Sequence, residues 1–210
     1  MNRAIFPPRP KGKINPSDLP HYEALGSWCA QRKFNGSRNL IHIDANKNLT
    51  VWGRYGEAHK KFVITSAFKI EILDSLELKP NTEYWLDSEV MNKQVNAKNE
   101  IILYDILQEG KYFFQTKTQV ERLELLNCIC GNPKTSNGIA LKISKNLWMA
   151  ETYYDSFVAR FKETLTNPVL EGLVLRKKDS KLDHFGNVYY ETNNIIRCRK
   201  PFAKDKGYNL

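Results

Sequence analysis

Lys33 is the residue of this sequence best placed to act as a nucleophile. It opens the segment 33–38 (KFNGSR), three residues before a glycine and five before an arginine. The pattern predicts a lysine at the end of a strand, beside a turn that can face a phosphate. An amine attacks only when it is unprotonated, and a free lysine has a pKa of about 10.4, so nearby cations would be needed to favour the neutral form. For this spacing alone, a solvated lysine is the alternative.

Five further motifs follow this segment in order along the chain. Each has an ordinary alternative when taken alone: a strand acid, a core tyrosine or a solvated basic strand. Six motifs in one order are much harder to explain in that way. The five are GRYG at 53–56, LDSEV at 86–90, IILYDI at 101–106, LEGLVLR at 170–176 and IIRCRK at 195–200.

This order resembles the covalent nucleotidyltransferase superfamily, and specifically the adenylation domain of ATP-dependent DNA and RNA ligases. The resemblance covers residues 29–201, nearly the whole chain. It implies that Lys33 attacks the α-phosphate of ATP and becomes lysyl-AMP, releasing pyrophosphate, with Arg197 and Arg199 as the other catalytic residues. AMP would then pass to a polynucleotide 5′-phosphate, and a 3′-hydroxyl would displace it to join the strands.

The resemblance also implies residues that bind the nucleotide and a metal ion. Arginine forks bind phosphates through two hydrogen bonds, aromatic rings stack on adenine, and Mg²⁺ prefers oxygen ligands. Glu89 and Glu171 would hold Mg²⁺ or Mn²⁺, or accept hydrogen bonds from the ribose. The implied ATP-binding residues are Gln31, Arg38, Arg54, Glu89, Tyr104 and Arg176.

Several positions depart from the family pattern. Hydrogen bonding survives where asparagine replaces the usual aspartate, but the charge is lost. Arginine keeps the charge of lysine but does not release a proton as a general acid. The departures are Asn35 for aspartate, Ser88 for glycine, Gln31 for glutamate, and Arg176, Arg197 and Arg199 for lysine.

The length of the chain predicts one domain. It has 210 residues, and ten follow Lys200. The oligonucleotide-binding-fold domain that accompanies this domain in many DNA ligases has no room there. We therefore expect residues 1–210 to form a single minimal adenylation domain.

The charge balance predicts a polyanionic partner. Lys and Arg number 32 against 23 Asp and Glu, giving a formal net charge of +9. Bases gather in residues 1–13, which hold no acid, and in residues 176–210, where nine bases face four acids. Basic ends on a folded body suit nucleic acid, and a solvated surface is the alternative.

The sequence carries no membrane or zinc signature. No apolar run reaches the roughly 18 residues needed to span a bilayer, and the N-terminus lacks the apolar segment of a secretory signal. The four cysteines and four histidines do not follow zinc-ligand spacings. We expect a monomeric, cytoplasmic protein, of the kind a phage encodes, with free thiols and no membrane partner.

The elements that must position these residues are predicted as strands in hairpins with helices inserted irregularly. This pattern indicates an α+β fold with mainly antiparallel sheets flanked by helices, as in the ATP-grasp-like nucleotidyltransferase domain of DNA and RNA ligases. The proline-rich segment 1–20 is predicted as an extended arm with a turn. Strands are predicted at 28–33, 39–44, 49–54, 84–91, 101–107, 139–149, 170–177 and 194–200, and helices at 62–78, 118–130 and 153–165.

We therefore predict an ATP-dependent ligase that seals nicks between a 3′-hydroxyl and a 5′-phosphate. DNA and RNA are left open, with a very slight preference for RNA. The segment around Lys33 and the GRYG motif look more like DNA ligases, whereas the absent second domain and the IRCRK ending look more like phage-type RNA ligases. The alternatives are a GTP-using capping guanylyltransferase and a non-catalytic module that binds nucleic acid.

Overall fold

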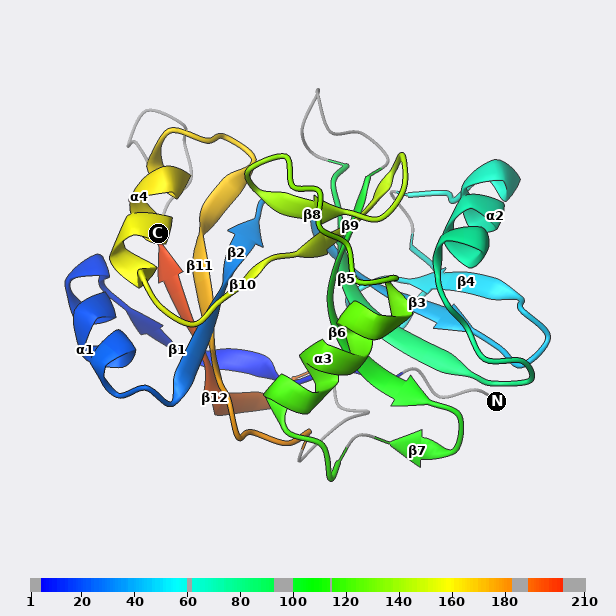
Figure 1. The fold of residues 1–210 in the computed structure, drawn as a ribbon, viewed down its shortest axis with the longest axis horizontal. Coiled ribbons are helices and arrows are strands. Elements are labelled where there is room, and N and C mark those ends of the chain that lie inside the picture. The colour runs from blue at the N-terminus through cyan, green and yellow to red at the C-terminus, as the bar shows by residue number, and fades with distance from the viewer. Residues whose placement is uncertain (1–4, 60–61, 93–99, 114, 183–188, 202–210) are drawn as a thin grey trace.

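The computed structural model describes residues 5–59, 62–92, 100–113, 115–182 and 189–201. They form two sheets that lie side by side, with helices packed on them (Figure 1). The smaller sheet has five strands in the order β1-β12-β11-β2-β10. The larger sheet has seven, in the order β4-β3-β5-β6-β9-β8 with β7 paired to β6.

The smaller sheet is built from both ends of the chain. Its central strand β11 lies antiparallel to β2 and β12. Helices α1 and α4 pack on it and bury a cluster that includes Leu19, Phe157 and Leu173. Its elements are β1 (Arg9–Ile14), the 3-10 helix η1 (Pro16–Asp18), α1 (Leu19–Ala24), β2 (Trp28–Phe34), β10 (Thr152–Tyr153), α4 (Phe157–Leu165), β11 (Leu170–Lys177) and β12 (Glu191–Arg199).

The larger sheet is built from the middle of the chain. Its core includes residues of β3, β5 and β6 together with Ile72 of α2 and Leu126 of α3. Helix α3 begins with a capping box, in which the side chains of Thr118 and Glu121 each accept a backbone hydrogen bond from the other. Its elements are β3 (Ser37–Ile43), β4 (Leu49–Trp52), α2 (Ser66–Ser75), β5 (Tyr84–Val90), β6 (Ile101–Glu109), β7 (Tyr112–Phe113), α3 (Gln119–Ile129), β8 (Ala140–Lys142) and β9 (Leu147–Ala150).

The predicted α+β class with mainly antiparallel sheets is confirmed. The pairings between described strands are antiparallel except for β1 with β12 and β6 with β9. A third apolar cluster, which includes Phe34, Ile102 and Leu170, packs residues of the two sheets together. No helix in the described part of the chain is long and apolar enough to cross a membrane.

The prediction for residues 1–20 was wrong over its described part. Residues 9–14 form strand β1, parallel to the C-terminal strand β12, and residues 19–24 form helix α1. The strand tolerates Pro10 because β1 is an edge strand, where a missing N–H can face away from the ladder, and because its register shifts between Pro10 and Gly12. The pairing partner lies about 180 residues away, which no local pattern indicates.

The single strand predicted over 139–149 is in fact a hairpin of β8 and β9. The turn between them is fixed by Glu71 of α2. Its carboxylate accepts hydrogen bonds from the Ser144 hydroxyl at 2.6 Å, the Asn146 N–H at 2.6 Å and the Asn146 side-chain amide at 2.8 Å. Sequence periodicity did not reveal this long-range contact.

A bulge at Gly172 fixes how β11 meets its neighbours. The register between β11 and β2 shifts between Leu170 and Gly172, and Gly172 has φ +134°. A Cβ atom there would lie 2.1 Å from the backbone oxygen of Cys198 in β12. Only glycine fits this close approach, and the bulge sets the positions of Glu171 and Lys33 on adjacent strands.

Replacement of Gly172 by alanine is therefore expected to lower the free energy of unfolding by about 2–3 kcal/mol. Urea unfolding followed by circular dichroism measures this loss. Gly26→Ala is the matched control, because Gly26 also has a positive φ of +65° but nothing lies within 4 Å of an added Cβ. The control is expected to cost about 1 kcal/mol. Equal losses in the two variants would show that the close approach at Gly172 does not matter.

Candidate active site

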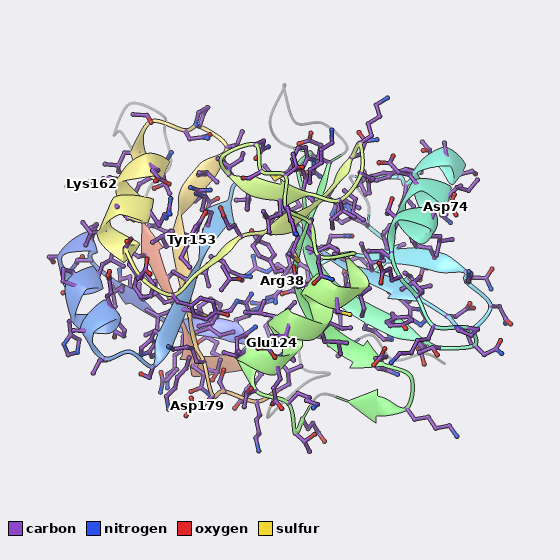
Figure 2. The ribbon with its side chains drawn as sticks, viewed as in Figure 1. Arg38, Asp74, Glu124, Tyr153, Lys162 and Asp179 are labelled. Carbon is purple, nitrogen blue, oxygen red and sulfur yellow. The ribbon has the colours of Figure 1, made fainter. Side chains whose placement is uncertain are left out.

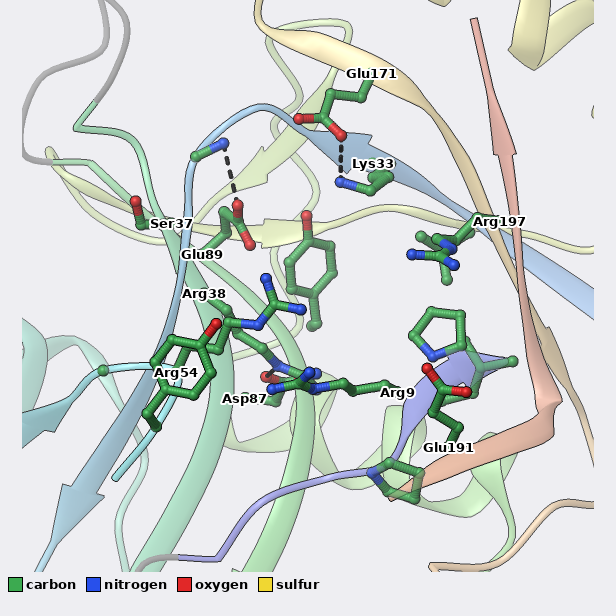
Figure 3. Close-up of a pocket in the computed structure, with 18 of the residues that line it drawn as sticks. Arg9, Lys33, Ser37, Arg38, Arg54, Asp87, Glu89, Glu171, Glu191 and Arg197 are labelled. Carbon is green, nitrogen blue, oxygen red and sulfur yellow. Dashed lines mark hydrogen bonds and ion pairs between the residues drawn. The ribbon is translucent and has the colours of Figure 1, made fainter. Parts of the chain in front are cut away.

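A cavity of about 560 Å³ opens between the two sheets (Figure 3). Residues of both sheets line it, together with the loop that follows β4. Nine of the ten predicted site residues belong to this lining, and Gln31 does not. The nine are Lys33, Arg38, Arg54, Glu89, Tyr104, Glu171, Arg176, Arg197 and Arg199.

Lys33 is held at the cavity wall by an ion pair with Glu171. The two side chains come from the adjacent strands β2 and β11, and Lys33 Nζ lies 2.5 Å from Glu171 Oε2 (Figure 3). The Nε atom of Arg199 lies 3.6 Å from the same oxygen. The Lys33 and Glu171 side chains are 19% and 15% exposed, so a ligand in the cavity can reach the amine. Lys33 can attack only after its amine has lost a proton, and the carboxylate of Glu171 is the contacting group that can accept this proton.

Glu89 faces the turn that follows Lys33. Its Oε1 accepts a hydrogen bond of 3.0 Å from the Gly36 N–H (Figure 3). A Cβ on Gly36 would lie 2.5 Å from the Val90 carbonyl oxygen, so the turn requires glycine here. Burial raises the pKa of Glu89 from 4.5 to about 7, with Asp87 and Glu171 adding to the rise and Lys33 and Arg38 opposing it.

Arg38 is oriented by a bidentate ion pair with Asp87. The guanidinium Nε and Nη2 donate to the two carboxylate oxygens at 2.9 and 2.8 Å. Burial opposes the charge on Arg38, but Asp87 outweighs it and raises the pKa above its usual value. The side chain lies in the centre of the molecule, between the sheets (Figure 2). Arg38 therefore presents a fixed cation to the cavity.

Arg176 connects the two sheets electrostatically. It belongs to β11 of the smaller sheet, and its guanidinium lies 3.9 Å from Asp87 Oδ2 and 3.7 Å from Asp105 Oδ2, both in the larger sheet. The side chain is 7% exposed. Its Nε has no hydrogen-bond partner among the described residues. The predicted nucleotide-binding residue thus also bridges the sheets.

Asp105 continues this chain of charges away from the cavity. Both of its oxygens accept from Arg122 of α3, with Nε at 3.1 Å from Oδ1, and Gln119 donates to Oδ2 at 3.2 Å. We call the five alternating residues Arg38, Asp87, Arg176, Asp105 and Arg122 the charge ladder. Sequence reasoning did not find its members Asp87, Asp105 and Arg122 as partners, because they lie on separate elements with no characteristic spacing.

Gln31 is hydrogen-bonded to Tyr104, and of the two only Tyr104 lines the cavity. The Gln31 amide donates to the Tyr104 carbonyl oxygen and to the Thr152 hydroxyl, both at 3.2 Å. The Tyr104 hydroxyl accepts from the Phe34 N–H at 3.2 Å. Gln31 is 1% exposed, and its Oε1 is buried with no partner in the part of the chain that the structure describes. The predicted contact of Gln31 with a ligand therefore depends on this oxygen alone.

The predicted metal ligands Glu89 and Glu171 both line the cavity. Among the described residues, no group of three His, Cys, Asp or Glu side chains could hold a metal ion by itself. Two carboxylates beside a phosphate site nevertheless suit Mg²⁺, which is usually held by one or two carboxylates together with substrate phosphates. The donor set fits, and the metal site stays a prediction.

The cavity also contains residues that sequence reasoning did not place there. Arg9, counted in the sequence only among the basic residues of the N-terminus, lies in the cavity with Tyr55 beside it. Burial lowers the pKa of Arg197, and the nearby Arg199 and Arg54 lower it further. Cations that destabilise one another in this way favour an anionic ligand.

The sequence matches no protein-family model and no curated protein, but the structure matches solved ligases. The ligase domain of M. tuberculosis LigD matches with a TM-score of 0.52 and 15% identity over 80% of this chain and 52% of that one. A Lig E DNA ligase matches with a TM-score of 0.55 and 14% identity over 93% and 68%. The ATP-dependent DNA ligase of bacteriophage T7, in complex with ATP, matches with a TM-score of 0.54 and 12% identity over 95% and 70%.

These matches establish the fold. The chain has the fold of the adenylation, or nucleotidyltransferase, domain of ATP-dependent ligases. It spans about half the length of the LigD ligase domain. Sequence identities of 12–15% do not transfer the roles of individual residues from these ligases to this chain. The candidate site residues therefore rest on the geometry described above.

The raised pKa of Glu89 predicts a pH-dependent stability. A carboxyl with a folded-state pKa of about 7 stabilises the fold fully below about pH 4.5, and this contribution is lost as the pH rises through 7. Between pH 5 and pH 8, Glu89→Gln should gain up to about 2 kcal/mol of unfolding free energy relative to the unmodified chain. Urea unfolding at each pH measures the difference.

Glu121→Gln is the control for this titration. Hydrogen bonds from the Thr118 N–H and hydroxyl lower the pKa of Glu121, so its difference from the unmodified chain should stay constant between pH 6 and pH 8. A flat profile for Glu89→Gln as well would show that Glu89 is ionised at neutral pH.

Proposed function

We propose that this protein is an ATP-dependent polynucleotide ligase that joins a 3′-hydroxyl to a 5′-phosphate through AMP carried on Lys33. The observation that carries the proposal is the Lys33 amine, held 2.5 Å from Glu171 at the wall of an arginine-lined cavity. The fold, shared with ATP-dependent ligases, supports the same reading.

In the first step, the Lys33 amine supplies the electron pair. Its nitrogen forms a bond to the α-phosphorus of ATP while the bond from that phosphorus to the bridging oxygen breaks, so that pyrophosphate leaves. The proton lost by the amine passes to Glu171, which contacts Lys33 Nζ. Arg197 and Arg199 would stabilise the charge on the phosphoryl oxygens, because this chemistry depends mainly on positioning and electrostatics.

The remaining predicted residues would bind the nucleotide and the metal ion. The unpartnered Oε1 of Gln31 can accept from the adenine amine, and Tyr104 would pack against the base. Arg38, Arg54 and Arg176 would contact ribose or phosphates. Mg²⁺ or Mn²⁺, held by Glu89 and Glu171, would neutralise charge on the phosphates.

In the later steps, AMP would leave Lys33 for the 5′-phosphate of the polynucleotide, and the 3′-hydroxyl would then displace AMP. Two of the solved structures named above, the Lig E ligase and the bacteriophage T7 ligase, are DNA ligases, which supports a polynucleotide substrate. The very slight preference for RNA stays a prediction. Activity as a single minimal domain over residues 1–210, the monomeric state and the cytoplasmic location are likewise proposals.

Lys33→Ala is expected to abolish covalent labelling of the protein by α-labelled ATP, because no other group would carry AMP. Lys33→Arg is expected to do the same, since a guanidinium stays protonated. Labelling is read on a denaturing gel. Lys162→Ala, which removes an exposed lysine of α4, is the control and should label fully. Persistent labelling of either Lys33 variant would disprove the assignment of the nucleophile.

Sealing assays should identify the polynucleotide. Four nicked duplexes that differ only in DNA or RNA on each side of the nick are incubated with the protein, ATP and Mg²⁺, and the joined product is quantified. Preferential sealing of an RNA 3′-hydroxyl would confirm the preference for RNA. A protein labelled by α-labelled GTP but not ATP would be a capping-type guanylyltransferase, and salt-sensitive binding without labelling would indicate a non-catalytic module.

A further inference from the structure

The side chain of Arg9 lies in the cavity beside two tyrosine rings, rather than on the solvated surface. Its guanidinium carbon lies 5.7 Å from the ring centroid of Tyr55 and 5.4 Å from that of Tyr189. The two rings belong to different parts of the chain, one to the loop after β4 and one to the segment before β12. Figure 3 shows the Arg9 side chain extending from β1 into the cavity, toward Arg38 and Asp87.

The guanidinium of Arg9 lacks an anionic partner in the described part of the chain. None of the ion pairs between described residues involves Arg9, and its buried Nη2 has no hydrogen-bond partner among them. Burial lowers the pKa of Arg9, and Arg54 and Arg38 lower it further. A buried donor that is left unsatisfied destabilises a structure, and a cation among cations does so more strongly. This arrangement is typical of a site that an anion completes.

We infer that Arg9 is a further substrate-binding residue, which holds a phosphate group of the substrate in the cavity. The inference rests on the proposed function, because that function supplies phosphates to this cavity. A guanidinium matches a phosphate through two parallel hydrogen bonds, and stacking on tyrosine rings fixes the plane of the fork before the ligand arrives.

The position of Arg9 in the sheet separates it from the chemistry at Lys33. On β12, Arg199 lies opposite Gly172, beside Lys33, whereas Arg9 pairs with Glu191 eight residues away. Strands rise about 3.3 Å per residue, so the backbone of Arg9 and the backbone of Arg199 lie far apart along the sheet. Arg9 therefore contacts a phosphate other than the one that Lys33 attacks. The outer phosphates of ATP and a phosphate of the polynucleotide are the two sources of this group.

Binding measurements on Arg9→Gln test the inference and separate the two sources. The measurements use a Lys33→Ala background, in which no covalent transfer occurs. One pair of ligands is ATP and adenosine, and the other is a nicked duplex with a 5′-phosphate and the same duplex with a 5′-hydroxyl. The background protein should prefer the phosphorylated member of at least one pair, and Arg9→Gln should reduce that preference about tenfold or more.

The pair that changes identifies the source of the phosphate. For the duplex, Arg9→Gln should also lower the slope of log affinity against log salt by about 1. Arg9→Lys keeps the charge and should retain more of the preference than Arg9→Gln. Three results would each overturn the inference. The first is an Arg9→Gln variant with unchanged preferences, and the second is a background protein with no preference for either phosphorylated ligand. The third is an Arg9→Lys variant that binds no better than Arg9→Gln.

Arg160→Gln is the matched control. Arg160 also stacks on a tyrosine, at 4.6 Å from the ring centroid of Tyr153, and its Nε is also buried without a partner among the described residues. It lies on α4 and does not line the cavity. Its loss should leave both preferences unchanged, and an equal effect would assign the result at Arg9 to packing. Labelling of the unmodified protein by ATP tests the proposed function separately.

Discussion

Two buried carboxylates hold the sheets in their relative positions. Asp87 and Asp105 are 1% and 0% exposed, and an isolated charge in such a place would destabilise the fold by several kcal/mol. Their compensating guanidiniums come from three other elements: β3, the strand β11 of the opposite sheet, and α3. Asp87 has both of its guanidinium partners only when β3 and β11 are in place, and Asp105 only when β11 and α3 are in place. The charge ladder therefore acts with the apolar cluster of Phe34, Ile102 and Leu170 in joining the two sheets beside the cavity.

The ladder leaves the cavity positively charged. Seven cationic side chains line the cavity against five carboxylates. One of those carboxylates, Glu89, has its pKa raised to about 7, so the excess of positive charge at neutral pH is larger than the counts alone indicate. Lys33 and Glu171 neutralise each other, and the excess resides on the arginines around them. A polyphosphate can thus be attracted to the cavity while the amine that would attack it stays paired.

The sequence predicted most of the functional residues that meet at the cavity, but it did not predict all of the residues that hold them in place. Lys33, Glu171, Arg197 and Arg199 were predicted from the order of motifs along the chain, which does not depend on knowing the strand partners, and all four line the cavity. The role of Asp105 was not predicted. The sequence around an aspartate in an apolar strand does not indicate that an arginine 17 residues later will neutralise it. The N-terminal strand was missed for a related reason, since prolines obscure an edge strand whose partner lies at the other end of the chain.

The pairing of β1 with β12 has a consequence for the order in which the protein folds. The larger sheet uses a continuous stretch from β3 to β9, so it can form as soon as that stretch has left the ribosome. The smaller sheet needs β11 and β12, and Lys33 acquires its partner Glu171 only with them. Strand β1 must remain unpaired until β12 (Glu191–Arg199) has been made, and β2 must wait for β10 (Thr152–Tyr153) and β11 (Leu170–Lys177). During synthesis, these first strands have their edges exposed for longer than any other segment of the smaller sheet.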